Sequence, residues 1–213
     1  MFSLFNRLNI GKTTGLDIVE ELINSKVLYI LESREKPIKT YAKQLIKKEL
    51  RDYTIEPKLY FKKPFFRFWF LFIEPLKKRN SNIDIEKVLI NYRKYGYRLS
   101  SSIFENLSQE LLIKSFKDID AIVESGSYWD RYSEFDIYSK CSSGAYILGE
   151  CKYKNRPVTQ AELKKIKFKA EVSNLKVDKY AIFSKNGFSH EFYKKLDSNT
   201  LLYTLNDFKK LIF

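Results

Sequence analysis

Cysteine and histidine are scarce in this sequence of 213 residues. It contains two cysteines, Cys141 and Cys151, and one histidine, His190. So few of these residues exclude a disulfide framework and most metal sites built from cysteine and histidine clusters. Without a disulfide framework a reducing compartment is the default, so we expect a cytoplasmic protein.

Long hydrophobic runs are absent as well. No stretch approaches the roughly 18 consecutive apolar residues of a membrane-spanning helix, so we expect no membrane partner. The N-terminal MFSLFNRLNIGKTTG lacks the regions of a secretory signal. Hydrophobic residues make up 44% and charged residues 31% of the chain. These values are typical of globular proteins, and the length allows one or two domains.

Positive charge is the unusual feature of the composition. Lysine and arginine total 39 against 26 acidic residues, a net charge of +13. The first hundred residues carry 21 basic and 11 acidic residues, so most of the excess lies there. A field of this size suits a polyanion, most simply a nucleic acid, and DNA is the expected partner. The alternative is a lysine-rich surface that reflects only an AT-rich genome.

The polar segment KKRNSN, residues 77–82, is the best candidate for a domain boundary because it follows Pro75 and precedes a new periodic segment. We therefore expect a basic region at 1–80 and a second domain at 81–213. In the first, a helix around 16–22 and a strand at 27–31 precede a charged segment that is a loop or a basic helix. A helix, a short strand and a basic hairpin in this order resemble the second half of a winged helix, whose basic wing contacts phosphate backbones.

Two motifs of the first region have structural explanations. The aromatic run PFFRFWFLF either stacks single-stranded bases or packs a hydrophobic core, and packing is favoured because aromatic side chains bury large areas. GKTT at 11–14 resembles the end of a phosphate-binding loop. The required upstream glycine is missing, because position 6 is Asn, and no strand is expected before it.

The second region alternates between helical and strand periodicity. The pattern predicts an α/β (α+β) fold in which helices flank a mixed sheet. Ser100, Ser101 or Ser102 is the expected N-cap of the second helix. The predicted helices cover 84–95, 101–115, 159–172, 189–196 and 206–213, and the predicted strands cover 118–125, 134–140, 145–153, 179–185 and 201–205.

Asp136, Glu150 and Lys152 are the residues that point to chemistry. Glu150 and Lys152 are two apart on a strand, so both side chains leave the same face. A hairpin centred on Ser143 would place Asp136 opposite Glu150, with Cβ atoms about 5 Å apart. Two carboxylates held so close cost energy unless a cation bridges them.

A divalent cation would resolve this conflict. Mg²⁺ (or Mn²⁺) prefers oxygen ligands, so Asp136, Glu150 and the backbone carbonyl of Cys151 are the candidate ligands. Lys152 would orient a water molecule or stabilise charge on a phosphate, which predicts hydrolysis of a phosphodiester. The alternatives are exposed charges on an edge hairpin and a nuclease-like fold with a silent site.

The residue pattern resembles the PD-(D/E)XK nuclease superfamily, whose core is a helix, three strands, a helix and a strand. The resemblance implies that Asp136, Glu150 and Lys152 are catalytic and that such domains often act as homodimers. It also implies assisting roles for Glu105, with Glu110 as the weaker choice, and for Gln160. One departure is Phe135, which stands where the superfamily often has Pro.

A narrower resemblance covers most of the chain. The segments PFFRFWFLFIEP and GSYWDRYSEFDIYSK…YILGECKYKNRPV are similar to the domain of unknown function that lies C-terminal to archaeal-type ATPases. The sequence leaves no room for the ATPase domain upstream of its first predicted helix. It is therefore either a fragment or a stand-alone relative. The resemblance implies a possible partner ATPase, and hence a catalytically silent regulatory or DNA-binding module as the alternative to a nuclease.

Basic residues follow the acidic pair closely and would track a phosphate backbone into the site, unless they form only a solvated helix face. They are Lys154, Arg156, Lys164, Lys165, Lys167 and Lys169.

Four other residues are expected to be structural. Cys151 alternates with the proposed ligands and should face the core, His190 opens a short helix, and Tyr128 and Trp129 pack.

Overall fold

The computed structural model describes residues 2–36, 39, 41, 43–50, 53–77 and 83–212. The chain forms two compact units. Unit 1 comprises Met1–Glu32 and Glu56–Ser100, and unit 2 comprises Ser33–Ile55 and Ser101–Phe213. Apart from Lys77, the expected boundary at 77–82 lies outside the described residues, so a division at residue 80 stays a prediction.

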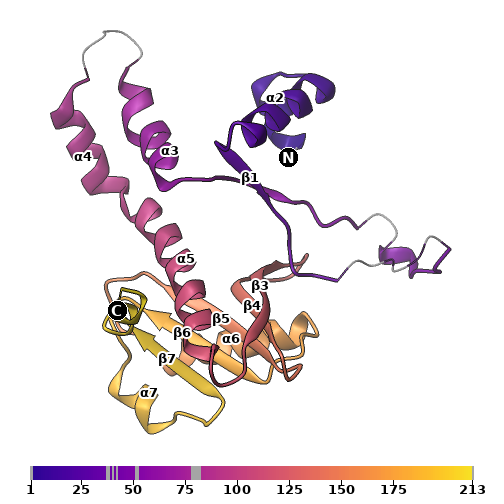
Figure 1. Ribbon diagram of the computed structural model, residues 1–213, viewed down its shortest axis with the longest axis vertical. Coiled ribbons are helices and arrows are strands. Elements are labelled where there is room, and N and C mark those ends of the chain that lie inside the picture. Colours follow the sequence, from indigo (N-terminus) through magenta and orange to yellow (C-terminus); the bar gives the residue numbers. More distant parts are fainter. Residues whose placement is uncertain are drawn as a thin grey trace. The chain divides into compact units, whose positions relative to one another are not determined.

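Unit 1 combines helices with a two-stranded antiparallel sheet (Figure 1). The expected helix and strand are both found, but β1 pairs directly with β2 and so forms one arm of the hairpin itself. From Ser33 onward the charged segment between them belongs to unit 2, and in its described part the helical structure is one short 3-10 helix, Lys48–Leu50. The elements of unit 1 are α1 (Phe2–Leu8), α2 (Lys12–Asn24), β1 (Leu28–Leu31), β2 (Lys58–Phe61), α3 (Pro64–Phe68), a π-helix (Trp69–Ile73), a 3-10 helix (Glu74–Leu76) and α4 (Ile85–Tyr95).

The aromatic run is helical, and the expected packing holds for part of it, because Phe65 and Phe70 are 59% and 48% exposed. Pro64 occupies the first turn of α3, where its missing N–H costs nothing. Phe72 is 1% exposed, and its ring lies 5.5 Å from that of Phe68 and 5.4 Å from that of Tyr92. The GKTT segment begins α2 directly after the helix α1, so no strand precedes it and the phosphate-loop reading is excluded.

Unit 2 contains the predicted mixed sheet. Its strands lie in the order β3-β4-β5-β6-β7, with antiparallel pairing from β3 to β5 and parallel pairing from β5 to β7. Neighbouring strands follow one another along the chain, and the parallel pairs are joined by crossover connections that contain helices. The predicted alternation of helix and strand is confirmed. The elements are α5 (Tyr97–Phe116), β3 (Ile122–Trp129), β4 (Glu134–Cys141), β5 (Tyr146–Lys152), α6 (Gln160–Val172), β6 (Lys179–Ser184), α7 (His190–Lys194), β7 (Thr200–Thr204) and a 3-10 helix (Asp207–Leu211).

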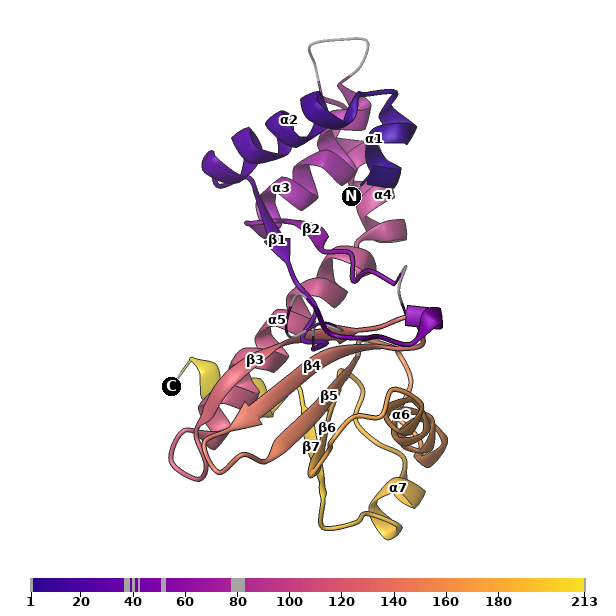
Figure 2. The ribbon, with the colours of Figure 1, turned by 90° about the vertical axis from the view of Figure 1, so that its right-hand side faces the viewer.

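Helices α5 and α6 lie on opposite sides of this sheet (Figure 2), and each packs with one of two hydrophobic clusters. On one face, Leu163 and Ile166 of α6 pack with Leu148 and Ile182 of the strands. On the other face, the apolar residues of α5, including Leu111, pack with strand residues of the opposite orientation. Strand β5 therefore contributes to both clusters and is buried on both sides, which fixes its register.

The expected N-cap of α5 is wrong. The helix begins at Tyr97, one turn earlier, so Ser100, Ser101 and Ser102 lie inside it. Ser101 instead donates its hydroxyl to Glu105 within the helix, at 3.3 Å. The helix before it does have a side-chain cap, because Asp84 accepts a hydrogen bond from the backbone N–H of Lys87.

None of the helices in the described part of the chain is both long and apolar enough to cross a membrane.

Gly149 sets how closely β4 approaches β5. It pairs with Ile137, and a Cβ at this glycine would lie 2.9 Å from the Cβ of Ile137. We expect Gly149→Ala to lower the free energy of unfolding by about 1–3 kcal/mol, because the two backbones must move apart. Urea unfolding measures this change, and an unaltered urea midpoint would contradict it.

Candidate active site

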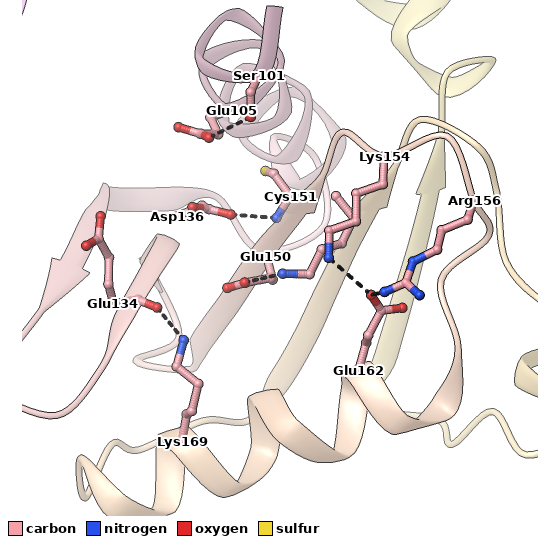
Figure 3. A network of polar contacts seen from close by, with 11 residues as sticks. Ser101, Glu105, Glu134, Asp136, Glu150, Cys151, Lys154, Arg156, Glu162 and Lys169 are labelled. Atoms are coloured by element: carbon pink, nitrogen blue, oxygen red, sulfur yellow. Dashed lines mark hydrogen bonds and ion pairs between the residues drawn. The ribbon is translucent and has the colours of Figure 1, made fainter. Parts of the chain in front are cut away.

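The ladder between β4 and β5 brings the two carboxylates together. The paired residues run from Lys140 opposite Tyr146 to Ile137 opposite Gly149, a register centred on Ser143 as predicted. One step further along, Asp136 meets the segment that starts at Glu150. There the carboxylate of Asp136 accepts a hydrogen bond of 2.7 Å from the backbone N–H of Cys151 (Figure 3). This bond holds Asp136 in place where the ladder ends.

Alternation along β5 separates the charged from the apolar side chains. Ile147 and Cys151 pack in the cluster on the α5 face, whereas Leu148 belongs to the cluster on the α6 face. Glu150 and Lys152 share the orientation of Leu148, because side chains alternate with period two. Both expectations are confirmed: the acid and the amine lie on one face, and Cys151 points into the core. Burial, followed by nearby Asp136, raises the pKa of the Cys151 thiol, so it stays protonated.

Lys152 forms an ion pair with Glu150, and both side chains are largely buried, with 18% and 12% exposed. Burial by itself lowers the pKa of Lys152, but Glu150 and then Asp136 offset this, so the pKa is raised. The ammonium group therefore stays charged between the two acids.

Asp136 experiences the strongest conflict. Burial and then the charge of Glu150 raise the pKa of Asp136 to about 7, although the Cys151 N–H opposes this. Glu105 of α5 adds further negative charge, and Figure 3 shows it beside Asp136, on the side away from Glu150. The predicted acid of the first helix is thus brought to the pair.

Glu150 has spare capacity for a cation. Its Oε1 binds Lys152, but within the described chain its buried Oε2 has no hydrogen-bond partner. A buried carboxylate oxygen left unpaired is costly. No group of three or more histidine, cysteine or acidic side chains in the described residues is placed to hold a metal. The donor set therefore fits Mg²⁺, which needs only one or two carboxylates, and does not fit a closed protein cage.

Gln160 is not directed to the acidic pair. Its side-chain amide donates hydrogen bonds to the backbone carbonyls of Phe192 and Lys195, at 3.1 and 3.2 Å. These contacts join the start of α6 to the end of α7. An assisting role for Gln160 stays a prediction that this arrangement does not favour.

The basic residues after the pair divide into two groups. Lys154 and Arg156 have largely exposed side chains that lie 3.6 and 3.7 Å from Glu162 (Figure 3). Lys164 and Lys165 are exposed on α6. By contrast, Lys167 pairs with Asp197 at 2.5 Å. These positions leave the first four available to phosphates more readily than Lys167.

Lys169 also serves the fold. It donates to the backbone carbonyl of Glu134 at 2.7 Å and lies over the ring of Phe135. This contact fastens α6 to the start of β4, beside Asp136.

Tyr128 and Trp129 are buried, as expected, and His190 is the first residue of α7.

Glu162 is the residue that sequence reasoning missed. Thr159 and Glu162 form a capping box at the start of α6, in which Glu162 accepts from the backbone N–H of Thr159 at 2.9 Å. The same carboxylate faces Lys154 and Arg156. The spacing Thr-x-x-Glu before an amphipathic helix was a sufficient signal.

Comparison with known proteins gives a partial family match. Residues 69–166 match the model of a family, DUF234, described as "Archaea bacterial proteins of unknown function". The match includes the WDRYSEFDIYSK and GECK segments that carry the narrower resemblance above. No curated protein matches the chain.

One solved structure is similar over most of the chain. It is described as "Refined half-complex from tetradecameric assembly of Thermococcus gammatolerans McrB AAA+ hexamers with bound McrC". The alignment has 10% identity and a TM-score of 0.34, and it covers 92% of this chain and 64% of that chain. The chain thus spans less than two thirds of that solved chain, and the likeness is too distant to carry an argument.

The raised pKa of Asp136 predicts an unusual dependence of stability on pH. In the folded protein this carboxyl keeps its proton up to a pKa of about 7, whereas the unfolded chain releases it near 4. The free energy of unfolding should therefore fall as pH rises from about 4 to about 7. In Asp136→Asn this fall should be absent, and the variant should be more stable than the wild type at pH 8, as measured by urea unfolding.

Asp197 provides a control of opposite sign. Hydrogen bonds from Lys167 and Thr200 lower its pKa, so its contribution is present at neutral pH and lost in acid. Asp197→Asn should therefore destabilise the protein at pH 8. If Asp136→Asn also destabilised the protein at pH 8, the conclusion that burial and Glu150 raise the pKa of Asp136 would be wrong.

Proposed function

We propose that unit 2 is a nuclease domain of the PD-(D/E)XK type that hydrolyses phosphodiester bonds of DNA with Mg²⁺ or Mn²⁺. The observation that carries the proposal is the unpaired buried Oε2 of Glu150, next to a second carboxylate whose pKa is raised. A purely structural ion pair would not leave one acid destabilised beside the other. A bound cation would relieve both, because it compensates the charge of two carboxylates at once.

Asp136 and Glu150 would hold the cation, with the backbone carbonyl of Cys151 as a proposed third ligand. The chemistry that Mg²⁺ or Mn²⁺ supplies in such a site is polarisation of a phosphoryl oxygen and acidification of water. Lys152, kept charged by Glu150, would stabilise the negative charge that develops on the phosphate. Glu105 would assist from α5. The exposed Lys154, Arg156, Lys164 and Lys165 would position the DNA backbone.

The proposal predicts cation-dependent cleavage that fails when one ligand is removed. We expect the wild-type protein to cut plasmid or single-stranded DNA in Mg²⁺ or Mn²⁺ but not in EDTA. Asp136→Asn, Glu150→Gln and Lys152→Ala should each lower the rate by about 10²-fold or more, the usual contribution of such groups. Gel-based cleavage assays and calorimetric titration with Mn²⁺ measure the two effects.

Glu191→Gln is the matched control, since this exposed acid on α7 lies outside the proposed site. It should cut DNA and bind Mn²⁺ like the wild type. Cleavage that survives Asp136→Asn would show that the activity comes from elsewhere. Mn²⁺ binding without cleavage would favour the second candidate below.

The second candidate is a module that binds DNA without cutting it, either alone or as the partner of an ATPase. Its support is the net charge of +13, because a strongly positive protein attracts DNA whether or not the acidic pair is catalytic. The ATPase partner rests on the resemblance of the sequence and on the match of residues 69–166 to a family of unknown function. A homodimer stays a prediction from the resemblance to paired nucleases.

DNA binding by the exposed lysines of α6 predicts a steep salt dependence. The logarithm of the association constant should fall linearly with the logarithm of salt concentration, because bound cations are released from the DNA. Lys164→Glu with Lys165→Glu should reduce that slope by about 2, since each phosphate contact contributes about 1. Fluorescence anisotropy in EDTA measures the slope without cleavage.

The control for this charge reversal is Lys194→Glu with Lys195→Glu, which changes the net charge equally at exposed positions of α7 and its end. It should leave the slope unchanged. An equal loss in both variants would mean that only the net charge matters and that α6 makes no phosphate contacts.

A further inference from the structure

Unit 2 contains a pocket whose lining does not include Asp136, Glu150 or Lys152 of the proposed active site. Its volume is about 790 Å³, and its walls come from residues 33–36, from β3, β4 and the start of β5, and from the segment that follows α6. This volume lies within the range of small-molecule sites, about 300–1,000 Å³. The convergence of several separate segments on one hollow makes it a candidate binding site.

Aromatic rings form one wall of this pocket. The rings of Tyr138 and Tyr146 are stacked, with centroids 5.3 Å apart, and Tyr128 meets Tyr138 edge-on at 5.6 Å. The hydroxyl of Tyr138 donates to the backbone carbonyl of Lys176, and that of Tyr128 donates to Asp130. Tyr128 and Tyr138 are 4% and 7% exposed and belong to the hydrophobic core, so the ring of this wall that a planar ligand can reach is that of the partly exposed Tyr146.

Cations border the same pocket. Arg34, Lys36, Lys140 and Lys176 line it, against two acids, Glu35 and Glu124, so the lining carries a formal excess of two positive charges. Lys176 lies 5.5 Å from the centre of the Tyr146 ring, and its side chain is 63% exposed. Lys176 also lies 3.9 Å from Asp178, and Lys140 lies 3.9 Å from Glu124, so a phosphate that enters the pocket would share these ammonium groups with those two acids.

Arg34 is the fixed cation of the pocket. Its backbone N–H donates to the carbonyl of Ser127, and its guanidinium binds Glu124 at 2.5 Å. Gly126 makes room for it, because a Cβ there would lie 3.1 Å from the Arg34 side chain. In the described part of the chain, the buried Nε of Arg34 has no hydrogen-bond partner. The Nε is out of reach of a ligand, but the Arg34 side chain is 23% exposed and lines the pocket, so an anionic oxygen can approach the anchored guanidinium there.

We propose that this pocket binds a nucleoside phosphate, either free or as one nucleotide of a single strand. The base would pack against the partly exposed ring of Tyr146, and the phosphate would bind Arg34 and Lys176. Glu124 and Glu35 would accept hydrogen bonds from the amino groups of the base or the hydroxyls of the sugar. These acids also disfavour a bare inorganic anion, so the ligand needs both an aromatic and a phosphate part.

The inference goes beyond the nuclease proposal and does not depend on a cation. The two sites share β4: Tyr138 and Lys140 follow Asp136 by two and four residues, about 7 and 13 Å along a strand. A DNA strand held in the pocket would therefore pass close to the acidic pair. Binding in the pocket can nevertheless be measured in EDTA, where no cleavage occurs.

The test is calorimetric titration of the full chain in EDTA with dAMP, with inorganic phosphate, with deoxyadenosine and with a single-stranded oligonucleotide of ten deoxyadenosines. We expect dAMP to bind at least tenfold more tightly than phosphate or deoxyadenosine. If the oligonucleotide binds and dAMP does not, the ligand is a nucleotide within a strand. If the oligonucleotide and dAMP both bind, the pocket also accepts the free nucleotide. Absence of binding by both would overturn the proposal.

Variants locate the binding. Lys176→Glu and Tyr146→Ala should each weaken nucleotide binding by about tenfold, equivalent to about 1.4 kcal/mol, and Tyr146→Phe should bind like the wild type. Lys194→Glu, on α7, is the control of equal charge change and should bind normally. Equal affinity in Lys176→Glu and wild type would overturn the proposal. Asp136→Asn should bind dAMP with the affinity of the wild type. Failure of the cleavage assay would therefore not count against binding in this pocket.

Discussion

The register between β4 and β5 is the constraint on which the candidate site depends. It places Ile137 against Gly149, where only a glycine allows the two backbones to approach so closely. The ladder then ends, and the next backbone N–H, that of Cys151, binds the carboxylate of Asp136. A shift of one residue would turn Glu150 and Lys152 to the opposite face and bury charge beneath α5.

The same register explains why the site is electrostatically strained. Burial on both faces of the sheet stabilises the fold, but it also removes water from the acids at the end of the β4–β5 ladder. Lys152 compensates one negative charge, but Asp136, Glu150 and Glu105 together present three. The excess raises the pKa of Asp136 and leaves an oxygen of Glu150 unpaired. Groups of this kind are more often functional than structural, because a fold gains little stability from them.

Around the end of the β4–β5 ladder, several charged side chains make contacts that also stabilise the fold. Glu162 closes the capping box of α6 and faces Lys154 and Arg156, and Lys169 joins α6 to the first residue of β4. The basic residues therefore divide into those that hold elements together and those that face solvent. The solvent-facing group is the one suited to a phosphate backbone.

The sequence alone determined the order of elements in unit 2 and the face shared by Glu150 and Lys152, because periodicity and alternation are local properties. It also predicted that Asp136 lies opposite Glu150, since the turn at Ser143 fixes the hairpin. Local pattern misled at the start of α5, where three serines suggested a cap although the helix begins at Tyr97.

Only the tertiary structure decided which side chains serve the site and which serve the fold. Gln160 binds carbonyls at the end of α7, and Lys167 binds Asp197, although both follow the motif closely in sequence. The pocket beside Tyr146 was equally invisible, because Arg34 reaches it from a segment about ninety residues before β3. Such contacts depend on distances between segments far apart in the chain, which composition and periodicity do not encode.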